Sequence, residues 1–192
     1  MLKSYTKDGA NVVTFATEQK DVATDDIVTI EFEHHAIHEG NSYGYAEAID
    51  LTLSYVYDIQ ITTPNTTKWT HFTYNFSVEN ETDWYFYENV NIITPGDVVT
   101  PLNRDRNSLN ASTLTIKVIT NTTTGNANAD TAVAGATILA HGMTGDKKTG
   151  GEANGRHEII LKQNEDYSLR FIATVAGYIS FHLDWYEYTN IA

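Results

Sequence analysis

The alternation of side chains between residues 51 and 61 limits the fold of this chain more than any other feature. Apolar or aromatic residues occupy every odd position, and most of the residues between them are polar. Successive side chains of a β-strand point to opposite faces, so this spacing predicts a strand with a core face and an outward face. The core set is Leu51, Leu53, Tyr55, Tyr57, Ile59 and Ile61, and the outward set is Thr52, Ser54, Asp58 and Gln60.

The same two-residue period recurs later in the chain. It appears in Phe72–Phe76, Leu114–Val118, Leu169–Ala173 and Ile179–Trp185, with turn residues such as Gly, Pro or Asn between the runs. Twelve tyrosines, with many Thr and Asn residues, also favour strands and turns over helices. Roughly eight to ten strands of this spacing predict an all-β fold, an antiparallel β-sandwich of jelly-roll-like type.

The beginning of the chain lacks this periodicity and carries mixed charge. We expect residues 1–25 to form a flexible N-terminal arm that orders on a partner, and residues 26–192 to form the sandwich domain. The chain has no cysteine, so packing and hydrogen bonds must stabilise it without disulfides.

The balance of charge argues against several classes of partner. Twelve Lys and Arg against 25 Asp and Glu give a net charge of −13, and no basic run is present, so we expect no nucleic-acid binding. The apolar stretches are shorter than the roughly 18 residues that span a bilayer, so we expect no membrane partner. The first residues, MLKSYTKDGANVVTF, lack the apolar segment of a signal peptide, which predicts synthesis in a cytoplasm.

The stretch Asn103-Arg104-Asp105-Arg106-Asn107 is the most distinctive polar motif. Two guanidinium groups alternate with three short side chains that suit charged hydrogen bonds. We therefore predict that these five residues pin a loop or form a subunit interface. A calcium loop is disfavoured, because Ser108 stands where glycine is required and Leu114 stands where a bidentate Glu belongs.

Three of the seven histidines lie within five residues, and imidazole is a common zinc ligand. A helix or a strand would bring only His34 and His38 to one face, whereas structural zinc needs about four ligands. We predict no metal and no other cofactor. His38-Glu39-Gly40 would instead be a structural turn, in which a strand ends at Gly40-Asn41. The three histidines are His34, His35 and His38.

The motifs of common enzyme classes are absent from the sequence. No nucleophile elbow, P-loop or dinucleotide fingerprint occurs. Asp184 and Glu187 can in principle supply the acid and base of a glycosidase, but their spacing does not show that they lie close together. We therefore expect no catalytic residues and no enzyme activity.

The aromatic run Trp84–Tyr87 keeps a binding alternative open. Exposed rings in this run would stack on sugars, and the chain would then be a carbohydrate-binding β-sandwich module that adheres to host glycans. The other interpretation is that half of these rings face the core.

Three parts of the chain resemble a known family in type and order. They are Ile37-His38-Glu39-Gly40-Asn41-Ser42-Tyr43, then Trp69-Thr70-His71-Phe72, then Asn103–Asn107 together with Trp185-Tyr186-Glu187. From residue 30 to residue 188 the chain resembles virion structural proteins of tailed bacteriophages, in particular capsid decoration or head-auxiliary proteins.

The resemblance implies a non-enzymatic β-sandwich on the outer surface of a virion. Such a head cement protein binds the major capsid protein and forms a homotrimer. The acidic charge suits an outer shell surface better than a surface that faces packaged DNA. In this interpretation Asn103–Asn107 is the subunit junction and the N-terminal arm grips the capsid.

Overall fold

The structure is a computed structural model that describes residues 3–5, 12–14, 32–121, 130–144 and 151–189, with side chains for 34–120, 130–144 and 158–189. The chain divides into two compact units, Met1–His35 and Ala36–Ala192. In the first unit, β1 (Lys3–Tyr5) and β2 (Val12–Thr14) pair antiparallel. The predicted arm boundary at residue 25 lies outside the described residues, so the arm remains a prediction.

Strands make up most of the rest of the chain. Within the described residues, no helix is both long and apolar enough to cross a membrane. In chain order the elements are α1 (Phe32–His38), β3 (Ser42–Leu51), β4 (Val56–Thr62), β5 (Lys68–Val78), β6 (Thr82–Glu88), β7 (Asn91–Ile92), β8 (Asp97–Val99), β9 (Leu102–Asn103), β10 (Thr115–Asn121), β11 (Thr131–Ala132), β12 (Thr137–Thr144), β13 (Gly151–Leu161), β14 (Asp166–Ala173) and β15 (Gly177–Thr189).

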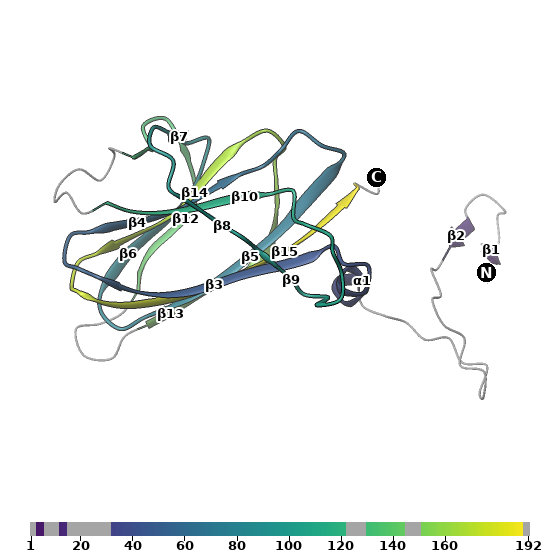
Figure 1. The fold of residues 1–192 in the computed structure, drawn as a ribbon, viewed down its shortest axis with the longest axis horizontal. Helices are drawn as coiled ribbons and strands as arrows, with labels where there is room; N and C mark the ends of the chain where they lie inside the picture. The colour runs from purple at the N-terminus through teal and green to yellow at the C-terminus, as the bar shows by residue number, and fades with distance from the viewer. Residues whose placement is uncertain (1–2, 6–11, 15–31, 122–129, 145–150, 190–192) are drawn as a thin grey trace. The chain divides into compact units, whose positions relative to one another are not determined.

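The strands from β3 onward form two antiparallel sheets (Figure 1). One sheet has the order β12-β6-β14-β4-β10-β8 and the other has the order β13-β5-β15-β3-β9, while β7 and β11 pair separately. Successive strands alternate between the two sheets along β3–β6 and again along β12–β15. The predicted all-β antiparallel sandwich is therefore confirmed. Its jelly-roll subtype remains a prediction.

The core lies between the sheets and is filled largely by aromatic rings. On β5 the even-numbered residues from Thr70 to Val78 are buried, and on β15 the odd-numbered ones from Ile179 to Glu187 are, as period-2 alternation requires. Phe76 of β5 meets Phe171 of β14 edge to face, with ring centroids 4.9 Å apart. Phe72 stacks on Phe86 of β6 at 5.8 Å. Rings from both sheets thus interdigitate, in the edge-to-face and stacked geometries that aromatic pairs prefer.

The predicted strand over residues 51–61 is in fact two strands. Leu51 ends β3, and β4 begins only at Val56. Between them Ser54 takes a positive φ of 65°, and Leu53 is 55% exposed instead of lying in the core. The prediction was wrong here because two runs with the same phase meet at a turn, and periodicity alone does not mark where a chain reverses.

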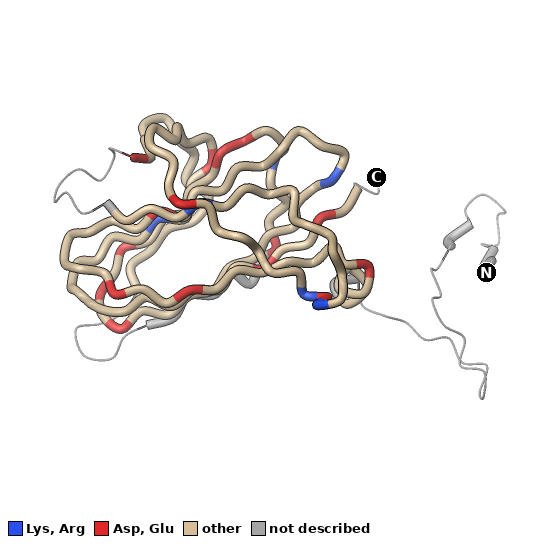
Figure 2. Tube along the Cα trace, viewed as in Figure 1, with Lys and Arg blue, Asp and Glu red and all other residues tan. Residues whose placement is uncertain are grey.

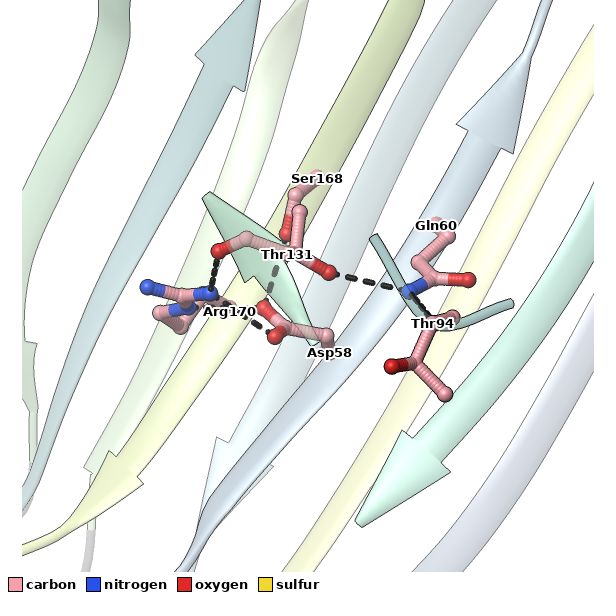
Figure 3. Close-up of polar contacts among 6 residues, drawn as sticks. All are labelled: Asp58, Gln60, Thr94, Thr131, Ser168 and Arg170. Atoms are coloured by element: carbon pink, nitrogen blue, oxygen red, sulfur yellow. Dashed lines mark hydrogen bonds and ion pairs between the residues drawn. The ribbon is translucent and has the colours of Figure 1, made fainter. Parts of the chain in front are cut away.

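The outer face of β4 is covered as well as its core face. Asp58 and Gln60 point away from the core as predicted, but they are only 2% and 1% exposed. Gln60 Nε2 donates to Thr94 O at 3.0 Å and to Thr131 Oγ1 at 2.9 Å, and its Oε1 accepts from the Gly96 amide at 3.0 Å. The segments around Thr94 and Thr131 thus form a lid over the sheet that the sequence did not predict (Figure 3).

A buried ion pair lies under the same lid. Asp58 accepts hydrogen bonds from Arg170 Nε at 2.7 Å and Nη2 at 2.8 Å, and from Ser168 Oγ at 2.8 Å. Arg170 Nη2 also donates to Thr131 O at 2.8 Å (Figure 3). Two hydrogen bonds join the opposite charges of Asp58 and Arg170, and each side chain also bonds one neutral group, Ser168 Oγ or Thr131 O. A buried bidentate pair requires such additional hydrogen bonds.

Removing one member of this pair should destabilise the fold strongly. We expect Asp58→Ala to lower the free energy of unfolding by about 3–5 kcal/mol, because the Arg170 charge would stay buried without its partner. Urea unfolding followed by tryptophan fluorescence measures the loss. The control is Lys162→Met, which breaks the ion pair between Lys162 and Glu88. The lysine side chain of that pair is 64% exposed, so this variant should leave the midpoint of urea unfolding nearly unchanged. Equal losses in the two variants would contradict a special role for the buried pair.

Candidate functional site

The segment 97–110 joins the edges of the two sheets and is the strongest candidate for an interaction site. It contains β8, the last strand of one sheet, and β9, the last strand of the other. In Figure 1 it crosses from β10 to the start of β3 beside α1. We call residues 97–110 the edge segment. Short edge strands of this kind leave backbone groups and side chains available to a partner.

The edge segment exposes three large apolar side chains. Val98 is 69% exposed, Leu102 is 60% exposed and Leu109 is 99% exposed. Exposed apolar residues scattered singly are normal, but three within one connection that carries the edge strands of both sheets are typical of a contact surface.

Asn103 fixes the conformation of this segment. Its side chain is buried, and Nδ2 donates to Gly40 O at 2.8 Å and to Asn110 O at 3.0 Å. Its Oδ1 accepts from the Asp105 amide at 2.9 Å, and Asp105 Oδ1 accepts from the Asn107 amide at 2.9 Å. These turns, in which a side chain bonds the backbone two residues on, hold the loop after β9 in one shape.

Arg104 and Arg106 lie on this fixed loop, where Figure 2 shows blue on a trace that is otherwise marked mostly by red. The Arg104 side chain is 46% exposed, and its Nη1 lies 3.8 Å from Asp184 Oδ1. Arg106 Nη1 donates to Asn103 O at 3.4 Å, and no carboxylate of the described residues pairs with it. Of the five predicted residues, Asn103 and Asp105 thus shape the loop through their side chains, Asn107 contributes its backbone amide, and the two arginines present charge. Their role in a subunit junction remains a prediction.

His38-Glu39-Gly40 ends a helix, so the predicted strand end was wrong. The chain is helical to His38, Gly40 takes a positive φ of 67°, and its amide donates to Ile37 O at 2.9 Å. The Asn41 amide donates to Ala36 O at 2.9 Å. These two bonds make a Schellman motif, which closes a helix at a left-handed glycine. The segment is only seven residues long, too short for its periodicity to stand out in the sequence.

The histidines of the same stretch lie in α1. Among the described residues, no three His, Cys, Asp or Glu side chains lie close enough together to hold a metal ion.

Asp184 and Glu187 cannot act as a glycosidase pair, because they point to opposite faces of β15. Glu187 is fully buried, and its carboxylate accepts from Ser112 Oγ at 2.6 Å and from the amide and hydroxyl of Thr113. It ties the loop before β10 to the core and has no access to a substrate.

The aromatic run on β6 is divided between two environments. Phe86 is fully buried and Trp84 packs against the core. Tyr85 and Tyr87 lie on the other face, where their rings stack 5.4 Å apart and Tyr85 also stacks on His141. Tyr87 is only 8% exposed, so Tyr85 is the one member of the run positioned on the outer face without deep burial.

Sequence reasoning missed a second polar site, around Glu47. Glu47 lies on the core side of β3, and its Oε2 accepts from the Tyr45 hydroxyl at 2.5 Å and from the Tyr57 hydroxyl at 2.7 Å. β3 pairs with β15 along one edge, and on its other edge it has no described partner strand beyond Gly44. The available signal was a single charge at an inward position of an alternating run, Tyr43, Tyr45, Glu47, Ile49 and Leu51.

Comparison of the chain with protein-family models, with curated proteins and with solved structures finds no match. The resemblance to phage virion proteins therefore remains a prediction.

The Gly40 turn gives a first test of how the edge segment is held. A Cβ at Gly40 would lie 2.2 Å from Ser108 Oγ, whereas a Cβ at Gly135, which also has a positive φ, would meet nothing within 4 Å. We expect Gly135→Ala to cost about 1–2 kcal/mol of folding free energy from backbone strain alone. Gly40→Ala should cost more, because residues 105–108 must also move. Chemical unfolding of both variants measures the difference, and equal costs would contradict the tight contact with Ser108.

The tyrosines around Glu47 should make the fold sensitive to alkali. Burial, then the hydrogen bonds and charge of Glu47, raise the pKa of Tyr45 and Tyr57 above 10.0, and burial raises the pKa of Tyr43 to about 12. The folded state therefore binds these protons more tightly than the unfolded chain. Their contribution to stability is complete below about pH 10 and is lost as the pH rises through the folded pKa values.

We therefore expect the free energy of unfolding to fall above pH 10, and to fall less steeply in Tyr57→Phe. Unfolding curves across this pH range, together with tyrosinate absorbance, measure both effects. Tyr178→Phe is the control, because that side chain is 59% exposed. An unchanged slope in Tyr57→Phe would contradict the linkage.

Proposed function

We propose that this protein is a non-enzymatic virion structural protein of a bacteriophage, a capsid decoration protein that binds the major capsid protein on the outer shell as a homotrimer. The observation that carries the proposal is the edge segment. It combines exposed apolar side chains with two arginines on a loop fixed by Asn103, on an otherwise acidic chain. A rigid patch of this composition suits contact with another protein.

The polar groups elsewhere support a structural role. Asp58, Arg170 and Glu187 are buried charges, and each is bound by groups that join separate segments of the fold. They stabilise the sandwich and are closed to substrates. A particle surface that presents many equivalent binding sites requires such a rigid unit.

A second candidate function is carbohydrate binding, which a hollow on the outer face of β5, β15 and β3 favours. It has a volume of about 370 Å³ and is lined by amide, hydroxyl and imidazole groups beside the small side chain of Ala46. Groups of this kind bind sugar hydroxyls, and small side chains leave room for a ring. The polar lining residues are Asn75, Ser77, Ser180 and His182.

Light scattering behind size exclusion tests the assembly role first. We expect a mass three times 21.4 kDa for the wild type, and a single chain for the variant Leu102→Asn/Leu109→Asn. Leu53→Asn is the control, because Leu53 is similarly exposed but lies outside the edge segment. Co-sedimentation should then show that the wild type binds shells of the major capsid protein encoded by the same genome. A wild type that is monomeric, does not bind these shells and binds a glycan array would favour the second candidate instead.

A further inference from the structure

A hollow of about 450 Å³ opens between the sheets beside the start of the edge segment. Its apolar walls include Ile49 and Val118, and the ring of Tyr57 forms part of the lining. Two carboxylates, Glu47 of β3 and Asp97 of β8, belong to the same lining. We call this cavity the acidic hollow.

No cation compensates the two carboxylates within the described residues. Glu47 Oε2 is held by the two tyrosine hydroxyls, and neither Glu47 nor Asp97 forms an ion pair there. Two negative charges beside low-dielectric walls create a local potential that attracts a cationic group. The apolar and aromatic walls favour a guanidinium, which is weakly hydrated and stacks on rings, over an ammonium.

The chain itself carries the matching group. Among the arginines whose side chains the structure describes, Arg170 is buried against Asp58. Arg104 and Arg106 remain as neighbouring guanidinium groups on one loop, where the Arg104 side chain is 46% exposed and its Nη1 lies 3.8 Å from Asp184 Oδ1. They cannot fill the hollow of their own chain. The Arg104 amide bonds Ser42 O, and Glu47 lies five residues further along β3, which is about 16 Å at the usual rise of a strand.

We propose that the acidic hollow receives the Arg104–Arg106 loop of a second copy of this chain. This inference rests on the assembly role proposed above and specifies its subunit contact. The donor loop and the acceptor hollow are different patches, so the contact is head-to-tail, and a rotation of 120° per subunit closes it into a trimeric ring. Val98 and Leu102, two of the exposed apolar residues of the edge segment, lie between the two patches along the chain and complete the interface.

Charge reversal tests the pairing. Asp97→Arg alone and Arg104→Asp/Arg106→Asp alone should each reduce the mass in solution from three chains to one. The combined variant, with all three reversals, should return to three chains because the charges are again complementary. Asp50→Arg is the control, since Asp50 is exposed on the opposite face of β3 and its reversal should leave the trimer intact. Circular dichroism confirms that each variant is folded.

Cysteine cross-linking distinguishes the contact geometry, because the chain has no cysteine of its own. Asp97→Cys mixed with Arg104→Cys should give an interchain disulfide, and neither variant should cross-link alone. Cross-linking of Arg104→Cys with itself, a trimer that survives either single reversal, a combined variant that stays monomeric, or a monomeric wild type would each overturn the inference.

The capsid proposal fails separately. A trimer that responds to charge reversal as expected but does not bind capsid shells would leave the ring contact standing and remove the decoration role. If the wild type binds shells and the Arg104→Asp/Arg106→Asp variant keeps the wild-type mass, the decoration role would stand and the ring contact would be wrong.

Discussion

The buried hydrogen bonds on the outer face of β4 hold the start of the edge segment in place. Gln60 binds the backbone at Thr94 and Gly96, and the Asp58–Arg170 pair binds the backbone at Thr131. The residues after Gly96 form β8 and one wall of the acidic hollow. The position of the proposed interface therefore depends on polar groups that are themselves closed to solvent, and loss of one partner would leave a buried charge uncompensated.

The edge segment is held at its other end by Asn103. Because the side chains of Asn103 and Asp105 satisfy the amides of their own loop, the loop is ordered before any partner binds. Binding then costs little conformational entropy, which is the advantage of a preorganised surface. The helix end at Gly40 belongs to the same unit, since Gly40 O accepts from Asn103 and a Cβ at Gly40 would displace Ser108.

Glu47 limits which partners can pair with the edge of β3 that faces away from β15. Much of β3 has no described partner strand on one side, and an unpaired edge invites pairing with any extended chain. A charge that points inward from such a strand makes indiscriminate pairing costly, because it would be buried without a counterion. A partner that brings a guanidinium removes this cost. Protection of the edge and selection of the partner are thus two effects of one carboxylate.

Alternation is a local property of each strand, so most of the strands and the all-β sandwich could be predicted from the residues alone. The sequence also singled out Asn103–Asn107 by composition. What covers each face of the sheets depends on contacts that form only in the folded chain. Alternation predicts that Asp58 and Gln60 face solvent, but distant segments bury them. The spacing of Asp184 and Glu187 left open whether they lie close together, and β15 places them on opposite faces. Glu47 meets Tyr57 only after β3 and β4 fold into different sheets. Contacts between residues far apart in sequence leave no periodic signal in either one, which is why these sites required the fold.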